Sequence, residues 1–101
     1  MIRVSVMYPN GANATFDVDY YCQRHMALVQ ELLAPSLKGL GVDWAVENAE
    51  APAPYIAVGY LIFDTVADFQ AALATHGPEL LADIPNYTNT RPVFQISEIR
   101  M

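Results

Sequence analysis

His25 is the side chain in this sequence best placed for acid–base chemistry. It lies on an apolar stripe with the spacing of one helix face, and Tyr21 lies one turn earlier on that face. Tyr8, at the end of the first predicted strand, reaches the same region. An imidazole that is partly removed from water beside tyrosine hydroxyls is tuned for proton transfer near neutral pH. We therefore take His25 as a candidate general acid or base, with Tyr21 and Tyr8 orienting it or donating hydrogen bonds. The alternative is a structural core histidine that donates to a carbonyl or a tyrosine oxygen.

Three other residues have weaker chemical signals. Cys22 precedes His25 by less than one turn and suggests a thiolate pair, but a lone cysteine within a helix is usually a small buried hydrophobic residue. His76 is expected at a helix C-terminus, where a carbonyl hydrogen bond is favourable, so we assign it a structural role. Asp83 precedes a Pro-Asn turn. It either caps that turn or, if the loop folds over a cleft, orients a histidine and closes the pocket.

No pattern in the sequence is typical of a metal or nucleotide site. His25 and His76 are the only histidines, and they are not spaced as zinc ligands. Glycine-rich phosphate-binding loops are also absent from the sequence. We therefore expect no metal and no resident cofactor, although a single histidine is enough to hold a haem.

The composition predicts a small apolar domain that covers residues 1–101. Of these residues 53% are hydrophobic and only 16% are charged, so part of the apolar surface should be covered by a partner. The net charge is −6 and the few cations are scattered, which argues against nucleic acid and anionic membranes as partners. A single cysteine, no recognisable signal peptide and no apolar run long enough to cross a bilayer favour the cytoplasm.

Hydrophobic periodicity and turn residues predict elements in the order β-α-β-β-α-β. The predicted strands are 2–8, 42–47, 55–63 and 93–99. One helix begins after Asp17 and runs to Ala34, before Pro35, with Phe16 packed on Tyr21. A second helix begins after Thr65 and ends near His76, because Gly77-Pro78 is a strong helix stop.

This order predicts an α+β domain with both helices on one face of a four-stranded antiparallel sheet. The segment Tyr55–Phe63 carries no charge, as expected for a central strand that is buried on both faces. Its two sides are both apolar, and two helices can cover only one of them. One side carries Tyr55, Ala57, Leu61 and Phe63, and the other carries Ile56, Val58, Tyr60 and Ile62. We therefore expect the uncovered face to meet its equivalent in a two-fold homodimer.

Several short motifs spread over nearly the whole chain form a familiar combination. Tyr8-Pro9 ends the first strand, and Phe16-Asp17, Tyr20-Tyr21 and His25 follow on the first helix. The segment Asp-Ile-Pro-Asn-Tyr-Thr, residues 83–88, precedes the last strand. Together these motifs resemble the EthD family of small dimeric α+β-barrel proteins. Ala27 is a small departure, because many relatives have proline there.

The resemblance implies a ferredoxin-like fold, a dimeric α+β barrel, and a cavity in each protomer with the helix histidine at its wall. It does not imply one reaction. The family takes its name from a protein linked to fuel-ether degradation, and proteins of similar fold include lactone isomerases, dehydratases and cofactor-free or haem-dependent oxygenases. Fold-level analogy is weak evidence for chemistry.

Our leading hypothesis is a cofactor-free enzyme that acts on a small apolar metabolite, oxygenated or aromatic, by oxygenation, isomerisation or dehydration. His25, Tyr21 and Tyr8 would be catalytic, and Tyr20, Asp83 and Tyr60 would contact the substrate. One alternative is a non-catalytic accessory protein that binds a hydrophobic metabolite for a partner enzyme. Another is a protein whose only function is association, with a structural His25.

Overall fold

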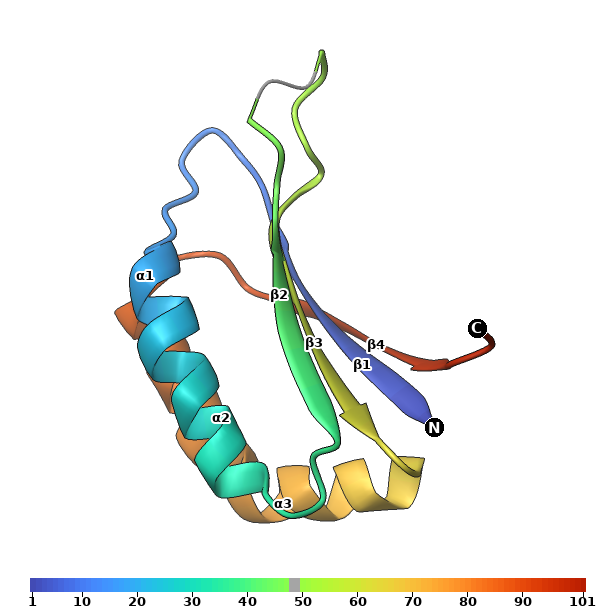
Figure 1. The fold of residues 1–101 in the computed structure, drawn as a ribbon. Coiled ribbons are helices and arrows are strands. Elements are labelled where there is room, and N and C mark those ends of the chain that lie inside the picture. The colour runs from blue at the N-terminus through green and yellow to red at the C-terminus, as the bar shows by residue number, and fades with distance from the viewer. Residues whose placement is uncertain (48–49) are drawn as a thin grey trace.

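The computed structural model describes residues 1–47 and 50–101 and has the predicted order of elements (Figure 1). The strands are β1 (Ile2–Pro9), β2 (Gly39–Trp44), β3 (Tyr55–Phe63) and β4 (Val93–Glu98). They form one antiparallel sheet in the order β2-β3-β1-β4. The first helix consists of α1 (Val18–Tyr20), η1 (Tyr21–His25) and α2 (Met26–Leu33), and the second is α3 (Val66–Asp83), followed by η2 (Ile84–Asn86).

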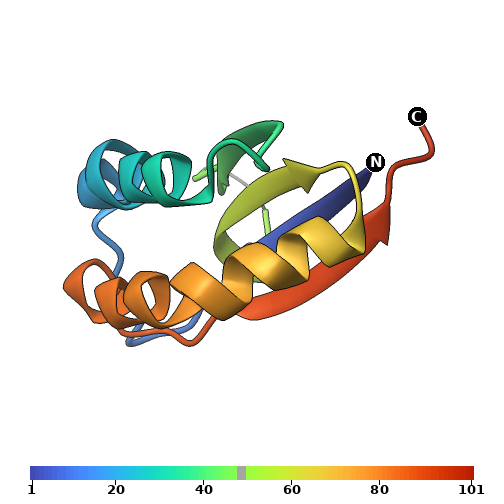
Figure 2. The same ribbon diagram turned by 90° about the horizontal axis from the view of Figure 1, so that it is seen from below.

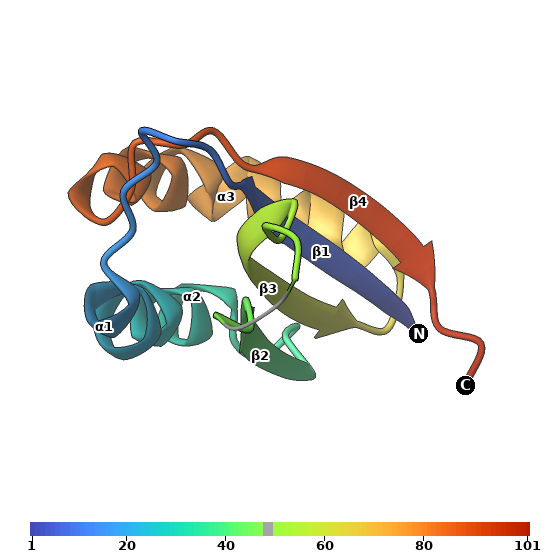
Figure 3. The ribbon, with the colours of Figure 1, turned by 90° about the horizontal axis from the view of Figure 1, so that it is seen from above.

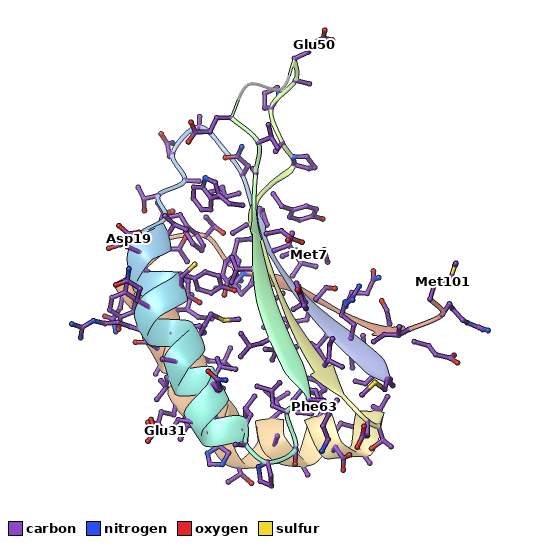
Figure 4. The ribbon with its side chains drawn as sticks, in the orientation of Figure 1. Met7, Asp19, Glu31, Glu50, Phe63 and Met101 are labelled. Carbon is purple, nitrogen blue, oxygen red and sulfur yellow. The ribbon has the colours of Figure 1, made fainter. Side chains whose placement is uncertain are left out.

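The helices lie on one side of the sheet and leave its other side open (Figures 2 and 3). Val4 and Phe63 are fully buried on the helix side. Figure 4 shows Phe63 toward the helices and Met7 on the opposite side of the sheet, as strand alternation requires. The charged residues Asp19 and Glu31 lie on the outer side of the first helix in the same view. No helix in the described ranges is long and apolar enough to span a membrane.

The first helix begins as predicted but is not α-helical throughout. The Asp17 side chain accepts the Tyr20 N–H at 3.0 Å, and the rings of Phe16 and Tyr21 pack edge to face with centroids 5.2 Å apart. The five residues of η1 form a π-helix, in which the Met26 N–H bonds to the Tyr21 carbonyl. Such π segments occur often at functional sites. Tyr21 and His25, the two ends of η1, are both buried.

Strand β2 begins at Gly39, three residues before the predicted start. The two glycines of this region, Gly39 and Gly41, were expected to precede the strand, but both pair with β3. Gly41 lies opposite Tyr60, and a Cβ at Gly41 would overlap the Tyr60 ring. Glycine is therefore needed inside the strand to make room for a tyrosine side chain.

Helix α3 continues through Gly77 and Pro78 to Asp83, so the predicted end near His76 is wrong. Proline removes one backbone hydrogen bond and bends a helix without always ending it. Figure 1 shows α3 changing direction near its middle. As a result His76 lies within the helix, not at its end, and Asp83 is carried on the last helical turn.

The contact between Gly59 and Tyr21 gives the first prediction. A Cβ at Gly59 would overlap the Tyr21 hydroxyl, so Gly59→Ala must displace the ring and should lower the free energy of unfolding by about 1–3 kcal/mol. Gly11→Ala is the control, because no heavy atom lies within 4 Å of its added methyl group. Urea denaturation of both variants measures the difference. If Gly59→Ala and Gly11→Ala are equally stable, the position of Tyr21 does not depend on the absence of a Cβ at Gly59.

Candidate functional site

The centre of the site is a hydrogen bond between the first helix and the end of α3. His25 Nδ1 lies 2.9 Å from Oδ2 of Asp83. His25 is only 7% exposed, whereas the Asp83 side chain is 14% exposed. The pair therefore combines a desolvated imidazole with a carboxylate that fixes its ring orientation and tautomer, as in hydrolase triads.

Two neighbouring side chains hold the Asp83 carboxylate in place. The Tyr20 hydroxyl donates to Oδ1 at 2.7 Å, and the Asn86 amide donates to the same oxygen at 2.9 Å. Oδ2 is thereby left to His25. Each carboxylate oxygen has a defined partner, so the position of Asp83 is determined by three side chains from two elements.

The environments of His25 and Asp83 shift both pKa values downward. Burial lowers the pKa of His25 below its usual 6.5, and the hydrogen bond and charge of Asp83 offset this only in part. Burial alone would raise the pKa of Asp83, but hydrogen bonds from Asn86, Tyr20 and His25 outweigh it and leave the pKa below its ordinary value. At neutral pH the pair is therefore a neutral imidazole beside a carboxylate, with Nδ1–H donating to Asp83.

His25 and Asp83 are far apart in sequence, and pairing between the segment before the first helix and the segment after α3 brings them together. Phe16 and Thr88 form an isolated β-bridge, and the Asp17 N–H donates to the Tyr87 carbonyl at 2.7 Å. The Thr88 hydroxyl donates to the Thr15 carbonyl, also at 2.7 Å. These bonds fasten the segment after α3 to the start of the first helix, which places Tyr87 beside the histidine.

Tyrosine rings surround the other side of His25. Tyr21 stacks on it with centroids 5.6 Å apart and planes 20° apart, and the Tyr87 ring lies 4.8 Å away. The hydroxyls of Tyr8 and Tyr87 are hydrogen-bonded at 2.6 Å. Burial raises the pKa of Tyr8, Tyr21 and Tyr87 above 10, so all three hydroxyls keep their protons and remain hydrogen-bond donors.

His25, Tyr8 and Tyr21 line a cavity between the helices and the sheet. The cavity and its mouth hold about 650 Å³ of space outside protein atoms, part of it open to solvent. Most of the other lining side chains are aliphatic, among them Val29 and Leu61. Because Nδ1 is bonded to Asp83, Nε2 is the ring nitrogen left for a molecule in the cavity, and it has no partner within residues 1–47 and 50–101.

The structure brings together five of the six residues assigned from the sequence. Tyr8, Tyr21 and His25 line the cavity, while Tyr20 and Asp83 form the hydrogen-bonded support behind His25. Tyr60 is not part of this group. It points to the open face of the sheet, where the Arg3 guanidinium lies 5.1 Å from its ring centroid.

Cys22 and two further residues differ from the expectation. Cys22 is exposed, so it is not the buried hydrophobic residue that its helix position suggested. Asn86 and Tyr87 belong to the site but were not singled out as functional. Both lie in the segment 83–88 that carried the family resemblance, and this was the available signal.

In the described part of the chain, no three His, Cys, Asp or Glu side chains are grouped as metal ligands.

Known protein families and solved structures include matches to this chain. The sequence profile described as the EthD domain matches residues 10–91. The chain belongs to the EthD family. An EthD-like protein from Ralstonia eutropha JMP134 is 41% identical over 99% of this chain and 92% of its own, and its structure superposes with a TM-score of 0.91. No curated protein sequence matches the chain.

More distant structures share the fold of this EthD chain. An EthD family protein from Bacillus halodurans C-125 is 17% identical over 98% of each chain, with a TM-score of 0.76. SnoaB from Streptomyces nogalater, a cofactor-independent oxygenase, is 14% identical over 99% of this chain and 92% of its own, with a TM-score of 0.62. The predicted ferredoxin-like α+β fold is therefore confirmed.

The electrostatics of the pair give a second prediction. Since Asp83 raises the pKa of His25 against the effect of burial, Asp83→Asn should lower that pKa further below 6.5. NMR titration of the imidazole protons of His25 measures the shift. A higher His25 pKa in the variant would contradict the assigned electrostatics.

Proposed function

We propose that this EthD protein is a cofactor-free enzyme that uses His25 as a general base on a small molecule bound in the apolar cavity. The observation that carries the proposal is the buried His25–Asp83 hydrogen bond, which leaves Nε2 at the cavity wall. A histidine that only filled the core would not need a carboxylate held by two further side chains. Perturbed pairs of this kind in a pocket are typical of catalytic sites.

The arrangement supports proton abstraction as the first step. Neutral His25 takes a proton at Nε2 from an acidic C–H or O–H of the substrate, and Asp83 stabilises the imidazolium that forms. The protonated hydroxyl of Tyr8 or Tyr21 donates to the oxygen on which negative charge develops, in exchange for a hydrogen bond that it makes within the tyrosine cluster. The lowered pKa of His25 and the raised pKa values of Tyr8 and Tyr21 support this division into a base and hydrogen-bond donors.

Oxygenation, isomerisation and dehydration can all follow from such a deprotonated substrate. In isomerisation and dehydration the imidazolium returns the proton to another atom or to a leaving hydroxyl. In oxygenation the electron-rich carbon gives electrons to O2 and, with the proton returned by the imidazolium, forms a hydroperoxide through a new C–O bond. Loss of water then breaks the O–O bond and leaves a carbonyl. We place oxygenation first, because SnoaB combines this fold with cofactor-independent oxygenase activity.

The catalytic role is tested with a screen followed by turnover measurements. Lactones, phenols, quinones and ethers are first ranked by thermal shift of the wild type, and the strongest ligands are assayed for conversion. His25→Asn should lower kcat by about 10²–10⁴. Because the variant also loses the bond to Asp83, kcat is compared at a temperature at which both proteins are folded. The pH profile of the wild type should keep its activity below pH 6.5, because the base has a lowered pKa.

His76→Asn is the matched control, because it removes the other histidine and should leave kcat unchanged. Wild-type turnover in His25→Asn would contradict the catalytic role. Binding without any chemical change to the ligand would instead favour an accessory protein that carries a hydrophobic metabolite.

We also propose that two protomers associate through the open face of the sheet. On this face lie the apolar side chains Met7, Val58 and Ile62, together with Tyr60, all only half-buried in one protomer. A sheet with an apolar second face is typical of a chain that needs a partner.

This assembly gives a separate prediction. Val58→Glu places a charge in the middle of the open face and should convert a dimer into a monomer in sedimentation analysis. Ala71→Glu, at an exposed position of α3, adds the same charge elsewhere and should leave the dimer intact. A monomeric wild type at high concentration would contradict the proposed assembly.

A further inference from the structure

The cavity is polar at one end only. His25, Tyr8 and Tyr21 lie where the first helix meets the end of β1, and they are the residues of the lining with polar side chains. No Lys, Arg, Asp or Glu of the described ranges lines the cavity. A bound molecule can therefore satisfy one polar group at this end, whereas a charge elsewhere along it would be desolvated without a partner.

Away from His25, the cavity continues into a second apolar hollow between α3 and β4. Five of the six residues that line this hollow, including Leu73, Leu81 and Phe94, also line the cavity, and Ile96 extends it along β4. Leu73 is 41% exposed, Leu81 50%, Phe94 51% and Ile96 44%. Figure 2 shows α3 running along β1 and β4. A contiguous group of exposed apolar side chains on a small protein typically marks a binding surface.

The strand register gives the length and direction of this apolar surface. Phe94 lies opposite Val6 and Ile96 lies opposite Val4, on the helix side of the sheet. From Tyr8 to Val4 the strand advances by about 13 Å. The apolar surface therefore leads from the tyrosine and histidine end in a line along β1 and β4, and Phe94 and Ile96 on β4 are about half exposed along this line.

We propose that the substrate is an elongated, uncharged lipophile with a single hydroxyl or carbonyl group at one end. Its polar end lies at His25, and its apolar body leaves the cavity between α3 and β4 along Phe94 and Ile96. This inference rests on the proposed function for the role of His25. The inference adds the substrate class and the position of the apolar end. Because the two hollows are continuous, one molecule can fill both.

Calorimetric binding of phenol, 4-butylphenol and 4-octylphenol tests the inference without any turnover. Each buried methylene of the ligand should tighten binding about fourfold, until its alkyl chain extends beyond Ile96. At pH 7.5, 4-octylbenzoate should bind at least tenfold more weakly than 4-octylphenol, because its carboxylate meets no cation in the cavity.

Ile96→Asn locates the alkyl chain of the ligand. It should weaken binding of 4-octylphenol by about tenfold or more and leave phenol unaffected, since Ile96 lies opposite Val4, lines the second hollow and does not line the cavity beside His25. Val66→Asn is the matched control, because Val66 is an exposed apolar residue of α3 that lines neither hollow.

The outcomes separate this inference from the proposed function. Affinity that does not depend on the length of the alkyl chain, or an equal loss for phenol and 4-octylphenol in Ile96→Asn, would overturn the inference. A change of oligomeric state in Ile96→Asn with unchanged 4-octylphenol affinity would also overturn it and assign the surface to a second copy of the protein. Binding that tightens with alkyl-chain length, without turnover, would support the inference and contradict catalysis. Turnover of short phenols, without any dependence of affinity on alkyl-chain length, would support catalysis and contradict the inference.

Discussion

The structure depends on one hydrogen bond between two groups that lose hydration on folding, His25 and Asp83. An imidazole with so little solvent contact needs a partner for its Nδ1–H, and the carboxylate needs donors of its own, which Tyr20 and Asn86 supply. The pairing holds only if the end of α3 is fastened to the start of the first helix. The loop contacts from Thr15 to Asp17 provide this fastening, and they also bring Tyr87 against the histidine.

The interior of the domain also holds His25 in position, through Tyr21 and the cavity beside the two rings. Gly59 leaves room for the Tyr21 hydroxyl, and the π-helical turn places Tyr21 and His25 with their rings stacked. The two rings face an apolar cavity whose walls lower the pKa of the histidine by excluding water. The apolar composition of the chain thus has a chemical consequence, because it keeps His25 neutral while Asp83 stays ionised.

Local sequence signals predicted much of this arrangement. The Asp17 and Thr65 caps, the Phe16–Tyr21 contact and the alternation of β3 are all present, because each depends on neighbours in sequence or on a simple period. Features that depend on distant packing were missed. Gly41 belongs inside β2 because of Tyr60, α3 continues through Pro78 to Asp83, and Asn86 acts through a carboxylate that it reaches only in the folded chain.

The tautomer of His25 is the most direct test of the account. The ¹⁵N chemical shifts of its ring at pH 7.5 distinguish a protonated Nδ1 from a protonated Nε2. The account predicts a neutral ring with the proton on Nδ1, donated to Asp83, and a bare Nε2 at the cavity. A proton on Nε2, or a doubly protonated ring, would contradict the role of His25 as a base.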